Sequence, residues 1–152
     1  MIDIDKTLMP WIGRSMKVID YFIADRFSKR GIDLTKVQWL LLMRLKQING
    51  ESQLNLACFT NRDKASLTRI ITTMEKKNLV ARIPSTSDKR INHVFITSNG
   101  EKILKMAMPV VDEMIEEMQT GLSEEERIVA IKVLKKLMNN IESIEQVALE
   151  SK

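Results

Sequence analysis

The sequence of 152 residues is poor in several residue types: it has one cysteine, one histidine, five glycines and three prolines. A single cysteine excludes a disulfide within the chain. One cysteine and one histidine also argue against a zinc site built from this chain alone, because structural zinc usually takes four such ligands. The scarcity of glycine and proline favours long helices over a turn-rich β fold.

Long apolar runs are also missing, and none approaches the 18 residues of a membrane-spanning helix. The N-terminus has no basic segment followed by an apolar stretch, so we expect no signal peptide and a cytoplasmic protein. No nucleophile–base pair, metal-ligand cluster or phosphate-binding glycine loop is recognisable. The sequence therefore predicts neither an enzyme nor a bound metal or cofactor.

Charge is present but unevenly distributed. The whole chain has a net charge of +4. Residues 62–90 contain eight Lys or Arg and three Asp or Glu, a net charge of +5, whereas residues 111–150 contain ten acids and four bases, a net charge of −6. The first region is suited to a polyanionic partner, and the second is not.

Hydrophobic periodicity predicts a first helix at residues 8–30 and a second, buried helix that begins after Thr35. A short helix is expected at residues 52–58. After a tight turn at 59–61, a further helix has apolar residues at positions 67, 70, 71 and 74, a spacing that gives it one buried face. Further apolar stripes predict two long helices, from about residue 100 to 120 and from residue 123 onward.

Two helices joined by a tight turn form a helix-turn-helix, whose second helix enters the major groove of DNA. The outer face of the expected second helix carries side chains that can contact base edges or phosphates. These candidate DNA contacts are Lys64, Ser66, Thr68 and Arg69.

Residues 79–83 and 93–96 read as two strands of a hairpin, separated by an exposed loop at 84–90. Lys89 and Arg90 end this loop. An arginine at the tip of such a loop can enter a narrow minor groove, where the negative potential of DNA is greatest. We therefore add Lys89 and Arg90 to the candidate DNA contacts.

Residues 69–100 resemble the MarR family of bacterial winged-helix regulators. The resemblance rests on Met-Glu-Lys-Lys-Asn-Leu-Val at the end of the helix, Arg82, Asp88-Lys89-Arg90, and Ile-Thr-Ser-Asn-Gly at 96–100. The family pattern has Gly where this chain has Asn78. Residues 61–65 are more charged than is usual in the family, a difference that bears on the operator sequence. Gln38-Trp39-Leu40-Leu41 is similar to the second helix of the family.

This resemblance implies a mainly α fold: a winged helix-turn-helix with a two-stranded β wing and dimerisation helices at both ends. The DNA-binding lobe would be residues 32–98, and the helical dimerisation region residues 1–31 and 99–152. It also implies a homodimer, a palindromic double-stranded DNA operator, repression, and release by a small ligand. Arg82 and Asp88 would support the wing, with Asp88 pairing with Arg82 or Arg90.

Two sets of residues leave alternatives open. Trp11, Met16, Trp39 and Met43 are candidates for a ligand pocket, or are plain packing residues. Cys58 has apolar neighbours, which favours a buried thiol, but it is also the basis of an alternative function as an oxidant sensor. A further alternative is a winged-helix protein-interaction module that does not bind DNA.

Overall fold

The computed structural model describes residues 3–150, and for residues 145–150 the backbone alone. Residues 1–2 and 151–152, which the predicted helical region includes, lie outside the described residues. The chain forms two compact units, Met1–Met114 and Ile115–Lys152. Among the described residues, no helix combines the length and the apolar character that a membrane crossing requires.

The first unit begins with a short 3-10 helix at Ile4–Lys6 and the long helix α1 (Leu8–Lys29). It continues with α2 (Lys36–Gln47), strand β1 (Glu51–Ser52), α3 (Gln53–Phe59), α4 (Lys64–Lys76), and strands β2 (Val80–Pro84) and β3 (Asn92–Ile96). Helix α5 (Ser98–Met118) crosses the boundary between the units, and α6 (Glu124–Glu150) belongs to the second. The predicted mainly α winged helix-turn-helix is confirmed.

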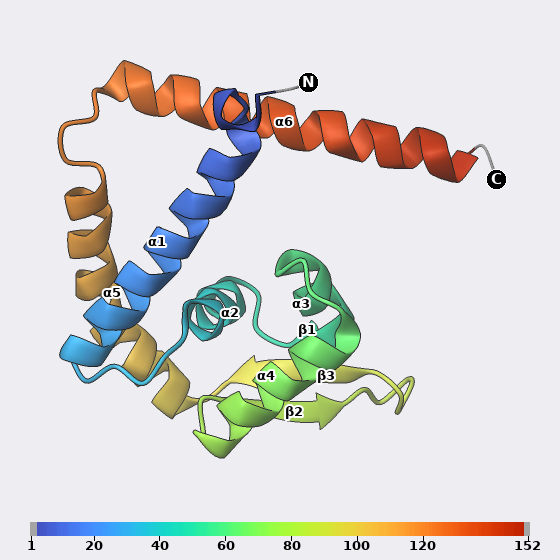
Figure 1. Ribbon diagram of the computed structural model, residues 1–152. Coiled ribbons are helices and arrows are strands. Elements are labelled where there is room, and N and C mark those ends of the chain that lie inside the picture. Colours follow the sequence, from blue (N-terminus) through green and yellow to red (C-terminus); the bar gives the residue numbers. More distant parts are fainter. Residues whose placement is uncertain (1–2, 151–152) are drawn as a thin grey trace. The chain divides into compact units, whose positions relative to one another are not determined.

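The predicted hairpin is present, and a third strand that the sequence did not predict joins it. The sheet is antiparallel with the order β1-β3-β2. Glu51 lies opposite Val94 in one pairing, and Arg82 lies opposite Val94 in the other. Figure 1 shows α3 and α4 beside this sheet, with the loop between β2 and β3 projecting past the strand ends.

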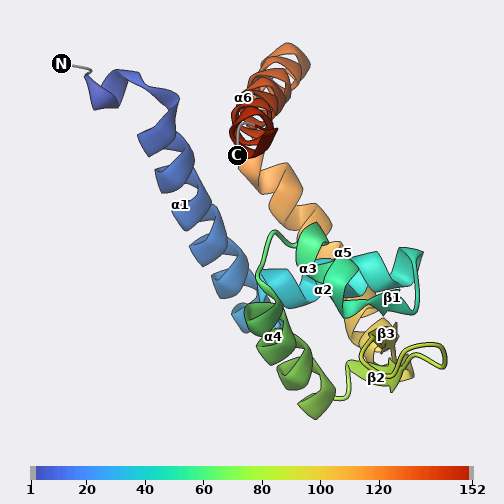
Figure 2. The ribbon, with the colours of Figure 1, turned by 90° about the vertical axis from the view of Figure 1, so that its right-hand side faces the viewer.

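The core lies where α2, α3, α4, the sheet and the first part of α5 meet. Three of the four leucines of α2, at positions 41, 42 and 45, are fully buried, as the apolar sequence of this helix predicts. Only the C-terminal end of α1 lies beside this group, as Figures 1 and 2 both show. The buried side chains of α1 are accordingly Ile23 and Phe27.

Local sequence explains the element boundaries. Thr35 and Gln38 form a capping box at the start of α2, where the sequence predicts that this helix begins. Asn78 follows α4 with a positive φ of 54°, a conformation that asparagine tolerates better than most residues. Gly100 is required by close packing, because a Cβ atom there would lie 2.1 Å from the carbonyl oxygen of Leu79. This contact holds the start of α5 against the start of β2.

An ion pair connects the short strand β1 to the helices. Glu51 is buried and accepts hydrogen bonds from Arg44 Nε at 2.7 Å and from an Arg44 terminal nitrogen at 2.8 Å. The Arg44 guanidinium also lies 5.2 Å from the centre of the Phe59 ring. Arg44 of α2 therefore contacts both β1 and the end of α3, which fixes the helix-turn-helix against the sheet.

Candidate nucleic-acid interface

Helix α4 presents the polar surface predicted for a recognition helix. Its N-cap is Asp63, whose carboxylate accepts a hydrogen bond from the Ser66 N–H at 2.8 Å. That hydrogen bond holds the pKa of the Asp63 carboxyl below its usual range. Leu67, Ile71 and Met74 are buried on the inner face. On the outer face, Lys64 and Arg69 are exposed, while Ser66 and Thr68 are half-buried.

The hydroxyls of Thr68 and Thr72 donate to the backbone of their own helix, α4. Thr68 Oγ1 donates to the Lys64 carbonyl at 2.8 Å and accepts a hydrogen bond from Gln53 Nε2 at 3.3 Å. Thr72 Oγ1 donates to the Thr68 carbonyl at 2.8 Å. Because the Thr68 hydroxyl already donates and accepts, it has less capacity for a base edge than the cations of α4 have.

Arg82 on β2 is held by Glu75 on α4. The Glu75 carboxylate accepts from Arg82 Nε at 2.8 Å and from the Arg82 backbone N–H at 2.9 Å, and an Arg82 terminal nitrogen donates to Thr72 at 3.2 Å. Partial burial disfavours the charged form of Glu75, but these hydrogen bonds and the arginine charge outweigh burial and lower its pKa. Arg82 therefore joins the wing to the recognition helix.

Asp88 acts on the wing loop and not on Arg82. We expected it to pair with Arg82 or Arg90; its carboxylate accepts from the Arg90 backbone N–H at 2.9 Å, and the partner of the Arg82 guanidinium is Glu75. Two backbone bonds complete the loop, from Ile91 N–H to the Asp88 carbonyl at 2.9 Å and from Ser85 N–H to the Ile91 carbonyl at 2.8 Å. The role of Glu75 was missed in the sequence.

One exposed cation of α4, Lys64, and one of the wing, Arg90, border a groove with a volume of about 510 Å³. Its lining comes from α3, α4, β2, the wing loop and the start of β3, and we call it the α4–wing groove. The lining residues are Gln53, Leu54, Lys64, Thr68, Arg82, Arg90, Ile91 and Asn92. The structure thus brings Lys64, Thr68 and Arg90 of the candidate set together, along with Gln53 and Asn92, which the sequence analysis did not single out.

Cys58 does not have the surroundings expected from its sequence. Its side chain is exposed, so the expectation of a buried thiol was wrong. Leu56 and Ala57, which precede it on the short helix α3, are the residues that are buried. Among the described residues, no cluster of Cys, His, Asp or Glu could hold a metal ion.

The four candidate pocket residues lie in different places. Trp11 and Met16 are exposed on α1, while Trp39 and Met43 are half-buried on α2 and pack against the core. Met43 also lines a cavity of about 600 Å³ between α2 and α5, together with Leu104. The structure of one chain therefore does not gather these four side chains around a single cavity.

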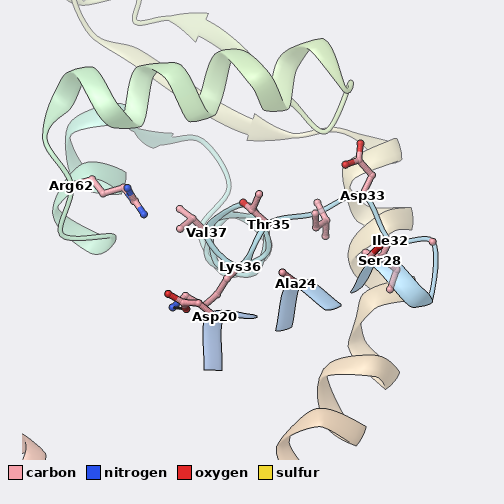
Figure 3. Close-up of a pocket in the computed structure, with 11 residues that line it drawn as sticks. Asp20, Ala24, Ser28, Ile32, Asp33, Thr35, Lys36, Val37 and Arg62 are labelled. Carbon is pink, nitrogen blue, oxygen red and sulfur yellow. Dashed lines mark hydrogen bonds and ion pairs between the residues drawn. The ribbon is translucent and has the colours of Figure 1, made fainter. Parts of the chain in front are cut away.

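A cavity of about 640 Å³ lies beside the junction of α1 and α2. Its lining includes Asp20 and Ser28 of α1 and Lys36 of α2, and Lys36 is ion-paired with Asp20. Figure 3 shows Arg62 extending toward Val37 from the turn that precedes α4. This cavity is therefore lined both by the first helix and by the turn that precedes the recognition helix.

Comparison with known proteins places this geometry in a family. The model of the MarR family matches residues 34–91. The transcriptional regulator HosA of Escherichia coli O157:H7 is 36% identical over 107 residues, which cover 70% of this chain and 79% of HosA. The chain belongs to the MarR family. The resemblance seen in residues 69–100 is thereby confirmed.

Solved structures agree with the MarR fold. A mutant of MarR from E. coli in which a serine replaces a cysteine, complexed with operator DNA, is similar with a TM-score of 0.79 and 24% identity, over 86% of this chain and 92% of that protein. The PcaV regulator of Streptomyces coelicolor, in complex with its natural ligand, is similar with a TM-score of 0.79 and 13% identity, over 91% and 96% of the two chains.

Proposed function

We propose that this MarR-family regulator is a homodimeric repressor that binds a palindromic operator in double-stranded DNA and is released by a small ligand. The observation that carries the proposal is the grouping of unpaired cations on α4 and the wing. Among the side chains that the structure describes, no carboxylate pairs with those of Lys64, Arg69, Lys89 or Arg90. These groups are therefore available to DNA.

The recognition helix and the wing would contact different parts of the duplex. Lys64, Ser66, Thr68 and Arg69 of α4 would lie in the major groove, where cations and hydroxyls contact base edges and phosphates. Arg90, with Lys89 beside it, would reach the adjacent minor groove. Arg82 and Asp88 would support the wing without contacting bases. The operator-bound MarR structure supports this mode of binding.

Dimerisation is supported by the apolar side chains that a single chain leaves exposed. On α6, Ile128, Ile131 and Met138 are 57%, 53% and 55% exposed. On α1, Trp11 is 55% exposed. Exposed apolar surface of this extent is costly in water and marks a protein interface. Two copies related by a two-fold axis would place their recognition helices about 34 Å apart, one turn of DNA.

The cavity beside α1 and α2 is the candidate site for the releasing ligand. Its contact with Arg62, in the turn before α4, means that a ligand there can favour one position of the recognition helix over another. Of the four residues expected at a pocket, Met43 lines the separate cavity against α5, which is the alternative site. The ligand-bound PcaV structure supports the general mode of regulation.

Arg90→Ala tests the DNA-binding proposal. Duplexes selected from random DNA by the native protein would be bound about tenfold more weakly by the variant at physiological salt, with a smaller dependence of affinity on salt. Lys76→Ala, an equal change of charge at the other end of α4, is the control. Fluorescence anisotropy measures both. Unchanged affinity of Arg90→Ala would refute the wing contact, and failure of the native protein to select any duplex would favour a protein-interaction module.

The exposure of Cys58 supports a second candidate function, an oxidant-sensing regulator. In that case peroxide would release the native protein from DNA, and Cys58→Ser would stay bound under the same treatment. Equal responses of the two proteins to peroxide would eliminate this candidate.

A further inference from the structure

The lining of the cavity beside α1 and α2 touches both ends of the recognition helix. At one end, Arg62 belongs to the lining and directly precedes Asp63, the N-cap of α4. At the other end, Asp33 belongs to the lining and contacts Lys77, the C-cap of α4. Figure 3 shows Arg62 and Asp33 at opposite ends of this helix, drawn in pale green. Because α4 has 13 residues and spans about 20 Å, a single cavity is connected to both of its ends.

The connection at the C-terminal end consists of two contacts between Lys77 and Asp33. The Lys77 ammonium donates to the Asp33 carboxylate at 2.7 Å and to the Asp33 backbone carbonyl at 3.1 Å. The Asp33 side chain is 85% exposed, and the Lys77 side chain is 27% exposed. Ion pairs that are open to water add little stability, so this contact can break and re-form at small cost. It therefore suits a connection that changes with the state of the protein.

Asp33 lies in the linker between α1 and α2, residues 30–35. Its neighbours Ile32 and Leu34 are buried in the core, and both also line the cavity. A group that enters the cavity therefore meets the two side chains that anchor the linker. Any displacement of Ile32 and Leu34 moves Asp33 with them, because the three residues are consecutive. The position of the linker is thus sensed by Lys77.

Lys77 also contacts the start of α5. Its backbone carbonyl accepts a hydrogen bond from Asn99 Nδ2 at 3.3 Å, and the next carbonyl, that of Asn78, accepts from Thr97 Oγ1 at 2.6 Å. The backbone at the end of α4 is therefore held by α5, whereas the Lys77 side chain is held by the linker. These two sets of contacts together fix the direction in which α4 leaves the core.

We propose that the contact between Lys77 and Asp33 couples occupancy of the cavity to the orientation of the recognition helix, with Lys77 as the positioning residue. This inference rests on the proposed function and on this cavity as the ligand site. With the cavity empty, the contact holds α4 in the orientation that binds DNA. A group that fills the cavity displaces the linker, Lys77 loses Asp33, and the C-terminal end of α4 is released. The ligand therefore favours the released orientation, to which it binds more tightly.

A covalent probe tests the coupling without the natural ligand. Ser28 lines the cavity, and Ser28→Cys combined with Cys58→Ser leaves one thiol in the chain. Benzyl methanethiosulfonate converts this thiol to a benzyl disulfide with release of methanesulfinate, which places an aromatic ring in the cavity. Fluorescence anisotropy with a selected duplex should show binding weakened about tenfold by the label. When Lys77→Met is added, the label should weaken binding by less than about threefold.

Two matched variants accompany Lys77→Met, which leaves the cavity wall unchanged because Lys77 is not part of the lining. Lys76→Met makes the same change of charge at the neighbouring exposed position and should keep the full effect of the label. Asp33→Ala removes the carboxylate but not the backbone carbonyl, so it should reduce the effect less than Lys77→Met does. A loss of stability alone would weaken labelled and unlabelled protein equally and would not change their ratio.

The possible failures of this experiment are distinguishable. An undiminished effect of the label in Lys77→Met would refute the coupling through Asp33 and leave the proposed function intact. A label without effect when Lys77 is present would refute the cavity as the releasing site, and the coupling with it. Failure of the native protein to select any duplex would refute DNA binding as well as the coupling.

Discussion

Helices α4 and α6 are both amphipathic, but they differ in what covers their apolar side chains. On α4, Leu67, Ile71 and Met74 are at most 1% exposed, because α2, α3 and the sheet pack around them. On α6, none of the side chains that the structure describes is buried, and Ile131 and Met138 are more than half exposed. The apolar face of an amphipathic helix is thus covered within one chain in the first unit and left exposed in the second.

This difference separates two sources of stability. The winged-helix region can bury its apolar residues without a partner, so its stability should be independent of protein concentration. An apolar helix that stays exposed needs another molecule, and its contribution then depends on concentration by mass action. The proposed dimer therefore follows from α6 and α1, whereas the proposed DNA contacts follow from α4 and the wing.

The largest expected effect is loss of the dimer on placing a charge in the apolar stripe of α6. Leu134→Lys would bury a cation without a partner, at a cost of about 3 kcal/mol, which raises the dimer dissociation constant about 100-fold. Ser143→Lys adds the same side chain nine residues further on, which is the opposite face of the helix, and should leave the dimer intact. Sedimentation at micromolar concentration measures both. A native protein with a single-chain mass, or equal behaviour of the two variants, would contradict the dimer.

The second prediction compares the substitution of alanine for isoleucine in α4 and in α6. Ile71→Ala removes a fully buried side chain and should lower the free energy of unfolding by about 2–5 kcal/mol at every protein concentration. Ile131→Ala should destabilise only to the extent that a partner covers it, so its effect depends on concentration. Urea unfolding at several concentrations measures both. Equal, concentration-independent losses would mean that Ile131 is packed within its own chain.

The sequence was sufficient for the elements whose local patterns are long. The apolar spacing of α4, the start of α2 after Thr35 and the two strands of the hairpin were each predicted, and the structure contains them. Strand β1 has only two residues, too few for any periodicity, and it is a strand because β3 lies beside it. Cys58 belongs to a seven-residue helix, on which its apolar neighbours in sequence are poor guides to burial.

The candidate site was predictable in its charges but not in its pairings. Lys64 and Arg90 follow from the position and sign of their side chains. Gln53 and Glu75 act through contacts that the fold creates, across 15 residues to Thr68 and across seven residues to Arg82. A local pattern cannot distinguish Glu75 from Asp88 as the partner of Arg82, because that choice depends on how the chain turns between α4 and β2.

The ion pair between Glu75 and Arg82 makes the stability of the winged-helix region sensitive to acid. Because folding lowers the pKa of Glu75, its contribution is complete above the usual value of 4.5 and is lost as the pH falls through the lowered pKa. Glu75→Gln should therefore flatten the fall in stability between about pH 5 and about pH 3, measured by urea unfolding. Asp112→Asn, an exposed carboxyl on α5, should leave that fall unchanged. An identical pH profile for native protein and Glu75→Gln would contradict this role.

The smallest expected effect distinguishes two adjacent hydroxyls of α4. Thr72 Oγ1 accepts a hydrogen bond from Arg82 in addition to donating to its own helix, whereas Thr73 Oγ1 donates to the Arg69 carbonyl. Thr72→Val keeps the shape of the side chain and should cost about 1 kcal/mol, since the Arg82 donor loses its acceptor. Thr73→Val makes the same chemical change at an exposed position without a wing contact and should cost less. Guanidinium unfolding of the two variants gives the difference directly, and equal stabilities would mean that the wing does not depend on Thr72. A measurable difference would mean that the winged-helix region satisfies its polar groups, like its apolar ones, within a single chain. The contrast with the uncovered helix α6 would then hold for polar contacts as well.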